Sequence, residues 1–314
     1  MTQYKRNIAL FISFIVLSVL SLVLFFASGS TKEEIDPALF RLSDSKSITK
    51  VVFTRDTAKI NLEFDKGSWW VNKTYQADRA LVDVLFATLA QAVPKRAAAK
   101  RVRDSVLHIA QQEGVKAEFF IGENLDIAIH VWGNEDAGIT YFIDEQNKVP
   151  YVMAIPGYRV FVGGIFAQGV GAWRDKRIFN FNWRNFTSLT ATFGNDQAQS
   201  FKALFTERFF SIEGLTNSDT TVVNDYLDAV SLIEANEFYT VGSSKKYDSL
   251  TRTKPVMSIA VAEVSGKVHV LDLFALGKGE PQALARWGND YVWFDRRNIL
   301  QIYKKRKDFV KKNL

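Results

Sequence analysis

The hydrophobic pattern begins with one long apolar run, residues 8–27, which is interrupted by three serines and contains no charged side chain. About 20 residues at about 1.5 Å each cover about 30 Å, the thickness of the hydrocarbon core of a bilayer. Lys5 and Arg6 precede the run, and such a basic flank favours a cytoplasmic N-terminus. We therefore expect residues 1–7 to be a cytoplasmic tail, 8–27 a single transmembrane anchor and 28–36 a polar stalk. The alternative is a cleaved signal peptide, although this apolar run is longer than is usual for one.

After the stalk the pattern changes to short alternating segments. Residues 48–53 and 59–64 alternate between apolar and polar positions, as half-buried strands do. Asp78 stands where a helix N-cap belongs, and apolar residues follow it at helical spacing. A second helix is expected over residues 104–113, where Gly114 would end it. Further strands are expected at 116–121, 126–132, 139–143 and 149–154, and again at 256–264, 267–274, 283–287 and 291–294.

The second half of the pattern resembles the first half after a shift of 188 − 47 = 141 positions. Ser47-Ile48-Thr49 then falls on Ser188-Leu189-Thr190, and Asp78 falls on Asp219. The other matched pairs are Phe40 with Phe181, Leu42 with Trp183, Phe64 with Phe205, Trp69 with Phe210, Val71 with Ile212 and Val82 with Val223. We interpret the body as two tandem α+β repeats, each a mostly antiparallel sheet with a packed amphipathic helix.

The repeat pattern also places the boundaries. We expect the first repeat at residues 37–172, a junction at 173–177, and the second repeat at 178–314, ending in a basic C-terminal helix. The junction holds Trp173-Arg174-Asp175-Lys176. One interpretation is a local network, Arg174 with Asp175 or Asp175 with Lys176, that sets the angle between the halves as a hinge or clamp. The other is a docking surface for a membrane partner, because Trp and Arg are enriched at interface hot spots.

With these segments in place, the chain resembles the bacterial family of membrane-anchored proteins catalogued as domain-of-unknown-function 4340. The residues that carry the resemblance are Phe40-Arg41-Leu42 with Ile48, Trp69-Trp70-Val71-Asn72 followed by Ala77-Asp78, and Trp173-Arg174-Asp175-Lys176-Arg177-Ile178-Phe179 between two similar halves. The resemblance covers nearly everything after the anchor. Members are similar to single-span proteins encoded beside ABC-type transport genes. The resemblance implies a membrane location and an association with transport, and it offers no catalytic residues.

The formal net charge of +6 is concentrated at the two ends of the chain. Lys5 and Arg6 contribute +2, and the residues from Lys304 onward contribute +5, which leaves 6 − 2 − 5 = −1 for the body. A nearly neutral body does not favour nucleic-acid binding. The basic run either places cations at a helix C-terminus or contacts anionic lipid headgroups. Its members are Lys304, Lys305, Arg306, Lys307, Lys311 and Lys312.

Candidate chemistry is sparse. The chain has no cysteine, which excludes disulfides, thiolate metal sites and a cysteine nucleophile. His108, His130 and His269 are not at metal-ligand spacing, and the sequence contains no GxSxG, Walker-type or HExxH motif. We predict no catalytic, metal or cofactor site. Of Trp69 and Trp70, at most one is free to stack on a sugar or a peptide, because neighbouring strand residues point to opposite faces.

These observations favour a non-enzymatic, membrane-anchored accessory or scaffold subunit of a cell-envelope assembly, associated with an ABC-type transport system. We expect it in the bacterial inner (cytoplasmic) membrane, with its body in the periplasm and the bilayer and a membrane protein, such as transporter subunits, as partners. One alternative is a module that holds glycan or lipid in a cleft between the repeats, which a deep, aromatic-lined cleft would favour. Another is a cell-envelope hydrolase, which requires carboxylates that converge in one pocket.

Overall fold

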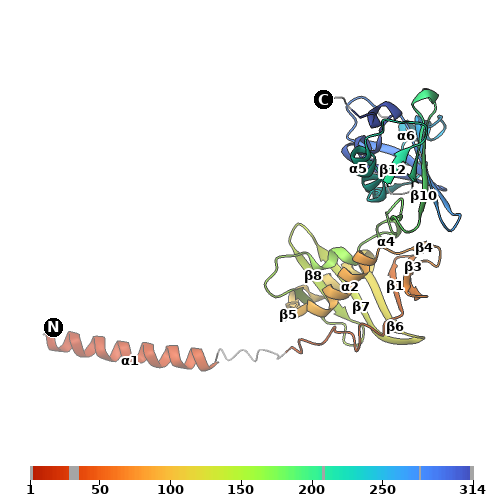
Figure 1. Ribbon diagram of the computed structural model, residues 1–314. Helices are drawn as coiled ribbons and strands as arrows, with labels where there is room; N and C mark the ends of the chain where they lie inside the picture. Colours follow the sequence, from red (N-terminus) through yellow and green to blue (C-terminus); the bar gives the residue numbers. More distant parts are fainter. Residues whose placement is uncertain (1–2, 28–34, 207–208, 276, 312–314) are drawn as a thin grey trace.

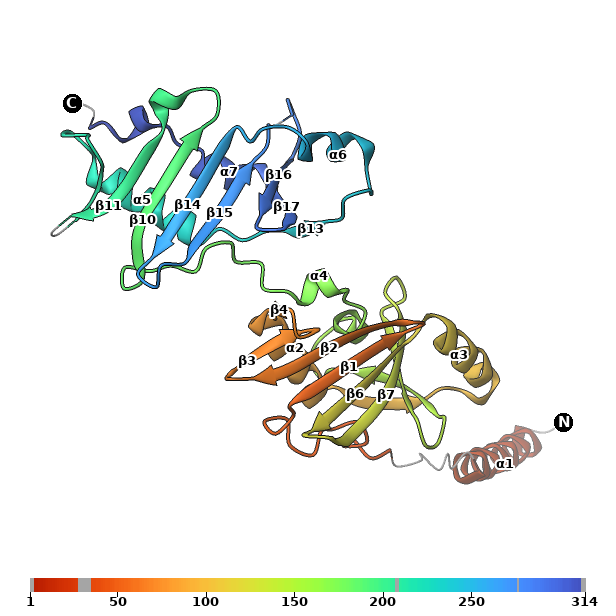
Figure 2. The ribbon, with the colours of Figure 1, turned by 90° about the vertical axis from the view of Figure 1, so that its right-hand side faces the viewer.

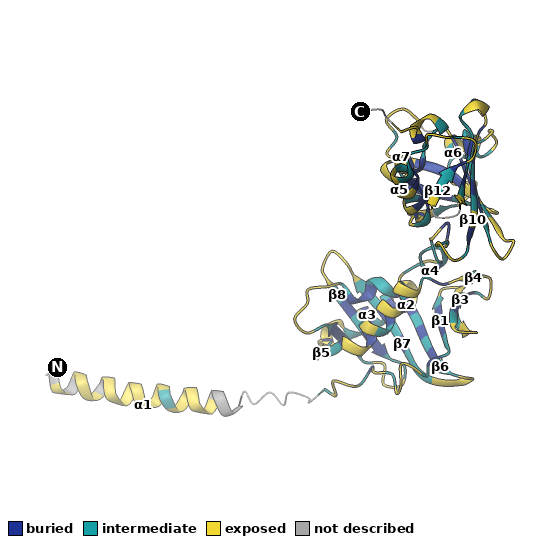
Figure 3. Cartoon of the chain, in the orientation of Figure 1, coloured by how far each residue is buried: buried dark blue, intermediate teal, exposed yellow. Residues whose placement is uncertain are grey.

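The computed structural model describes residues 3–27, 35–206, 209–275 and 277–311, and α1 (Gln3–Ala27) extends away from the rest of the protein (Figure 1). The window Arg6–Val23 is long and apolar enough to cross a membrane, and none of it is buried inside the protein (Figure 3). This confirms the expected apolar N-terminal helix, although a signal sequence meets the same criteria. Residues 28–34 of the expected stalk and residues 1–2 of the expected tail lie outside the described residues.

The body is α+β and contains two mostly antiparallel sheets, as expected, carried by two units (Figure 2). The first unit has the strand order β4-β3-β2-β1-β6-β7-β8-β9-β5. Its strands are β1 (Lys50–Arg55), β2 (Ala58–Asp65), β3 (Ser68–Val71), β4 (Tyr75–Gln76), β5 (Val93–Ala97), β6 (Val115–Ile121), β7 (Asn124–Asn134), β8 (Ile139–Asp144) and β9 (Pro150–Ala154).

The second unit has the strand order β12-β11-β10-β14-β15-β16-β17-β13. Its strands are β10 (Phe186–Phe193), β11 (Phe201–Thr206), β12 (Phe209–Ile212), β13 (Glu237–Tyr239), β14 (Met257–Glu263), β15 (Val268–Leu273), β16 (Gln282–Trp287) and β17 (Asp290–Asp295). The two sheets share one strand order if the two-residue strand β4 is left out. When the remaining strands of each sheet are numbered 1 to 8 along the chain, both sheets have the order 3-2-1-5-6-7-8-4.

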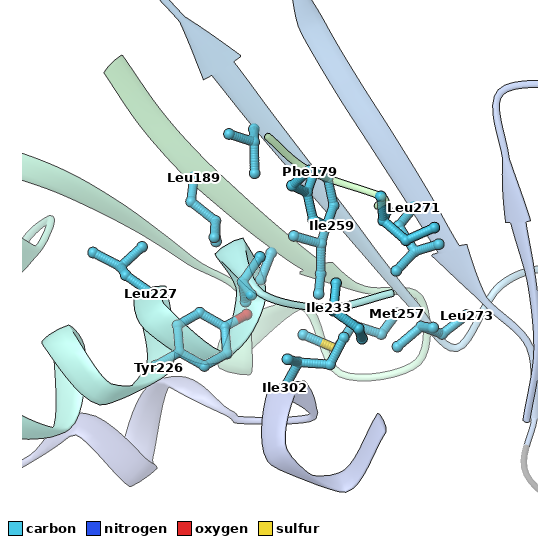
Figure 4. Packing of buried hydrophobic residues seen from close by; sticks show 14 of the residues in the cluster. Phe179, Leu189, Tyr226, Leu227, Ile233, Met257, Ile259, Leu271, Leu273 and Ile302 are labelled. Carbon is cyan, nitrogen blue, oxygen red and sulfur yellow. The ribbon is translucent and has the colours of Figure 1, made fainter. Parts of the chain in front are cut away.

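One amphipathic helix packs on each sheet. In α2 (Arg79–Gln91) and α5 (Thr220–Ser231) the buried positions recur at helical spacing and join the core of their own unit. The expected N-caps are confirmed: Asp78 accepts the N–H of Leu81, and Asp219 accepts the N–H groups of Thr221 and Val222. Figure 4 shows the second core, where Tyr226 and Leu227 of α5 face the sheet residues Ile259 and Leu271.

A second helix follows in each unit. The helix α3 (Lys100–Glu113) ends before Gly114 as expected, whereas α6 (Lys245–Thr251) had no clear periodicity in the sequence. The residues under α6 (Phe274, Leu284 and Trp293) form a separate cluster on the face of the second sheet opposite α5. The strands β5 and β13 were also missed. Both are edge strands, and β5 contains Pro94, which sheets tolerate at an edge.

The prediction that the basic run forms a C-terminal helix is wrong. The helix α7 (Arg296–Ile302) ends before the basic run, and a single 3-10 turn, η3 (Arg306–Phe309), follows. Phe309 is buried in the second core, so this turn is fixed to the sheet rather than continuing the helix. The first unit ends in two short turns, η1 (Val162–Ile165) and α4 (Val170–Trp173), and a further 3-10 turn, η2 (Gln197–Gln199), follows β10.

Candidate functional site

The junction segment, which here means the expected junction 173–177 together with Ile178, is bonded through its backbone to both units. On the first unit, the Asp78 N–H donates to the Trp173 carbonyl at 2.8 Å, and the Asp175 N–H donates to the Gln76 carbonyl at 2.9 Å. The segment therefore continues the edge of the first sheet next to β4.

The same segment then pairs with the second unit. The Ala235 N–H donates to the Lys176 carbonyl at 2.9 Å, and the Ile178 N–H donates to the Ile233 carbonyl at 3.2 Å. A linker bonded on both sides has little freedom to act as a hinge, because its own backbone hydrogen bonds hold its conformation. The arrangement is that of a clamp.

Trp173 belongs to the core of the first unit. It is 0% exposed and stacks on Phe53 with ring centroids 5.3 Å apart and planes 15° from parallel. A side chain that is fully buried has no surface to offer a docking partner. The repeat pattern predicts that the whole junction lies outside both units. For Trp173 this prediction is wrong, because its side chain is buried in the core of the first unit.

Arg174 connects the two units through its side chain. Its guanidinium carbon lies 3.6 Å from the ring centroid of Tyr75 in the first unit and 3.6 Å from that of Phe238 in the second. Its two terminal nitrogens donate to the carboxylate of Asp290 in the second unit, at 3.3 and 2.5 Å. The side chain is 10% exposed. A planar cation suits this place because it stacks on both rings while it forms a bidentate ion pair.

The charge partners expected within the junction are wrong. Asp175 pairs with neither Arg174 nor Lys176, but with Arg177, whose Nη2 lies 2.6 Å from its carboxylate. This hydrogen bond raises the pKa of the Arg177 guanidinium. The Asp175–Arg177 pair lies within the junction, whereas the side chain that contacts both units is that of Arg174. No local pattern of residues predicts the contacts of Arg174, because Tyr75, Phe238 and Asp290 lie far from it along the chain.

A cleft of about 740 Å³ opens beside Arg174, between the two units. Its aromatic side chains are Trp70 and Tyr75 from the first unit and Trp287 from the second. The two neighbouring tryptophans point to opposite faces of the strand, as expected: Trp69 is 8% exposed in the core, and Trp70 lines the cleft. The remaining lining residues are largely polar: Thr74, Gln76, Arg174, Asp175, Arg177, Ile178, Asn180, Asn185, Glu263, Lys267, His269, Gly288, Asn289 and Asp290.

The acidic groups of the cleft are paired with basic groups. Asp175 pairs with Arg177 and Asp290 with Arg174, while His269 Nε2 lies 3.1 Å from Glu263. A hydrolase would use one carboxylate in an apolar setting as a proton donor. In the cleft Asp175 and Asp290 are ion-paired and Glu263 is hydrogen-bonded to His269, so it does not supply the arrangement on which the hydrolase alternative depends.

The other two histidines lie outside the cleft. His108 is exposed on α3, and His130 on β7 is partly buried, with its Nδ1 3.9 Å from Glu145. Burial lowers the pKa of His130. Within the described ranges no group of three His, Cys, Asp or Glu side chains is arranged to hold a metal ion.

Several residues of the basic run are held against the second unit. Lys305 forms an ion pair with Asp196 at 3.0 Å, which raises the pKa of the lysine, and Arg306 donates to the Gly214 carbonyl at 2.7 Å. Lys304, Lys307 and Lys311 are also described, whereas Lys312 lies outside the described residues. In both ribbon views the dark blue C-terminal segment lies on the side of the second unit that faces away from the first unit (Figures 1 and 2). Contact of the run with lipid stays a prediction.

Comparisons of the chain with protein-family models, curated proteins and solved structures found no match. The resemblance to the domain-of-unknown-function 4340 family therefore rests on the motifs of the sequence. What the structure adds is their location: Trp69 and Trp173 are core residues of the first unit, and Arg174 joins the two units.

Proposed function

We propose that the chain is a non-enzymatic, membrane-anchored scaffold or accessory subunit of a bacterial cell-envelope assembly, associated with an ABC-type transport system. The observation that supports this most is the clamp at Arg174, in which one side chain contacts Tyr75, Phe238 and Asp290 of both units. A scaffold must hold its binding surfaces in a fixed relation, and a stacked, bidentate arginine serves that need.

The location that we propose follows from α1. The helix anchors the chain in the inner membrane, Lys5 and Arg6 keep the N-terminus cytoplasmic, and the body lies in the periplasm. Alkaline phosphatase, which becomes active outside the cytoplasm, provides the measurement when fused after residue 311. An active fusion that remains in the membrane fraction is expected. An inactive fusion contradicts the topology, and an active fusion found in the soluble fraction contradicts the anchor.

We further propose that the two units are copies of one ancestral unit. The shared strand order supports this, as does an equivalent contact in each unit: the Asp78 N–H bonds the Trp173 carbonyl, and the Asp219 N–H bonds the Phe309 carbonyl, both at 2.8 Å. Trp173 and Phe309 are then equivalent core residues that end the two units.

The ladder registers refine the alignment of the copies. Facing residues form the rows Val51–Leu62–Val71 in the first sheet and Leu189–Ala203–Ile212 in the second. The second and third members differ by 203 − 62 = 141 and 212 − 71 = 141, but the first members differ by 189 − 51 = 138. The shift of 141 therefore suits β11 and β12, while the gapless match of residues 47–49 with 188–190 is three residues out of register.

Purification from native membranes tests the scaffold role. The full-length protein, extracted in a mild detergent, is expected to carry membrane-protein partners at a constant ratio. The variant Arg174→Ala should lose partner recovery, because the two units no longer keep a fixed relation. The matched control is Arg177→Ala, which breaks an ion pair inside the junction and leaves the stacked arginine in place. Recovery of the wild-type protein alone contradicts the proposal.

A second candidate function is supported by the cleft. A volume of about 740 Å³ falls within the range of small-molecule sites, about 300–1,000 Å³, and aromatic side chains line both of its walls. On this account the chain is a periplasmic binding module that holds glycan or lipid between its two units.

A further inference from the structure

We infer that the cleft between the units binds a short, uncharged oligosaccharide, with Trp70 and Trp287 as its stacking surfaces. This inference rests on the second candidate function, since it names the class of ligand and the residues that recognise it. It is independent of the scaffold role, because a scaffold needs no small ligand.

The two tryptophans come from different units and are fixed by the fold. Trp70 lies on β3, and its neighbour Trp69 is in the core, so Trp70 is directed to the opposite face of the strand, toward the cleft. Trp287 ends β16, and its ring lies near-parallel to that of Phe238, with centroids 6.5 Å apart and planes at 28°. Rigid aromatic rings offer a large apolar contact with little loss of side-chain entropy, which suits the C–H faces of sugar rings.

The polar groups of the cleft suit hydroxyl groups. Gln76, Asn180 and Asn289 line the cleft and are exposed. A side-chain amide has donors and an acceptor in one plane, and a sugar hydroxyl can use both. A cleft with this lining does not suit an acyl chain, because the amides and charged groups would lose water without gaining partners.

The charges of the cleft indicate an uncharged ligand. Asp175 and Asp290 are each ion-paired with an arginine, and the remaining two charges of the lining, those of Glu263 and Lys267, are opposite in sign. Sites for phosphate groups gather several cations that their own protein does not neutralise. The cleft therefore favours a neutral glycan over a phospholipid headgroup or a nucleic acid.

The strand edge at the cleft is already covered. Peptides are commonly recognised as an added strand on a free sheet edge, or as a helix in an apolar groove. The edge strand β4 is followed by Ala77, which forms a β-bridge with Arg174, and the Gln76 carbonyl accepts the Asp175 N–H. With that edge occupied and the cleft largely polar, the geometry favours a saccharide over a peptide.

Isothermal titration of the full-length protein in detergent tests the inference, with cellotetraose, maltotetraose and chitotetraose as probes. At least one probe is expected to bind, and Trp70→Ala and Trp287→Ala should each weaken it by at least about tenfold, as expected for the loss of an aromatic platform. Trp183→Ala is the matched control, because Trp183 is 74% exposed and lies outside the cleft. Gln76→Ala and Asn289→Ala change exposed side chains, preserve the fold and should also reduce affinity.

Two results overturn the inference. The first is that no probe binds, or that Trp183→Ala affects binding as much as the cleft variants do. The second is a lipid, found by mass spectrometry of the purified protein, that is retained by the wild type and lost from Trp70→Ala; it would preserve the ligand-binding candidate while rejecting the saccharide. Partner recovery from membranes is a separate measurement, so its failure leaves this inference untouched.

Discussion

At the residue scale, three buried polar atoms without a hydrogen-bond partner in the described part of the chain lower the stability of the fold. Trp173 Nε1, Tyr226 Oη and Arg103 Nε are buried without a hydrogen-bond partner among the described residues. Such atoms lose their bonds to water on folding and regain none, which costs about 1–3 kcal/mol for a typical group. Trp173 and Tyr226 lie in the cores of the two units, where their large apolar surfaces compensate for this cost.

Tyr226→Phe is therefore expected to maintain or raise the free energy of unfolding, by up to about 1 kcal/mol, because it removes a hydroxyl that has no partner while it keeps the ring. The same burial raises the pKa of Tyr226, since it disfavours the charged form. Urea unfolding followed by circular dichroism provides the measurement.

Tyr239→Phe is the control for this change. The Tyr239 hydroxyl donates to Asp248 at 2.8 Å, so its removal should lower the free energy of unfolding by about 1 kcal/mol. Equal destabilisation by the two changes would contradict the assignment of the Tyr226 hydroxyl as unpaired.

At the element scale, the packing of α3 against β7 places a histidine where it resists protonation. Gly114 ends α3, and an added Cβ there would lie 2.9 Å from His130 Nε2, so the helix end and the strand are in close contact. Burial lowers the pKa of His130, although Glu145 opposes this, and Lys148 and Lys116 favour the neutral form further. The folded protein consequently binds this proton less readily than the unfolded chain does.

Stability should therefore fall as the pH drops below the ordinary histidine pKa of about 6.5, because the unfolded chain then takes up a proton that the folded state resists. His130→Gln should make the fall in melting temperature between pH 7.5 and 5.5 smaller. The control is His108→Gln, which changes an exposed histidine on α3. If the two variants show the same pH dependence as the wild type, His130 is not the group responsible.

At the scale of the whole molecule, one cation couples two units that each have a core of their own. The stacking of Arg174 on Tyr75 and Phe238, together with its ion pair to Asp290, accounts for a polar side chain buried between them. The backbone of the junction segment adds hydrogen bonds to both units. The coupling thus depends on a small, defined set of contacts.

Arg174→Ala is expected to widen the distribution of distances between the two units. Double electron–electron resonance, with one spin label in each unit, measures this distribution. The substitution should also lower the free energy of unfolding by about 1–3 kcal/mol, because Asp290 and the rings of Tyr75 and Phe238 lose their partner. Arg174→Lys should not restore the wild-type distribution, since a lysine cannot form the bidentate pair between two rings. In Arg177→Ala the distribution should remain narrow. A narrow distribution in Arg174→Ala would show that the backbone bonds alone hold the units.

The sequence by itself determined the local elements of this protein. Periodicity and capping act over a few residues, so these features could be predicted locally. They include the apolar N-terminal helix, the half-buried strands, the N-caps at Asp78 and Asp219, and the end of α3 before Gly114. The edge strands β5 and β13 escaped prediction, since they are short and gain their hydrogen bonds from strands distant in the chain.

Only the tertiary structure decided the role of the junction. The sequence grouped Trp173, Arg174 and Asp175 as one cluster, but the fold directs Trp173 into the first core, Arg174 between the units and Asp175 toward Arg177. The partners of Arg174 are brought to it by the edge strand β4, which begins at Tyr75, by the edge strand β13 and by the start of β17. Side chains so far apart along the chain meet only after both sheets have formed, so no local pattern could indicate the contact or the cleft beside it.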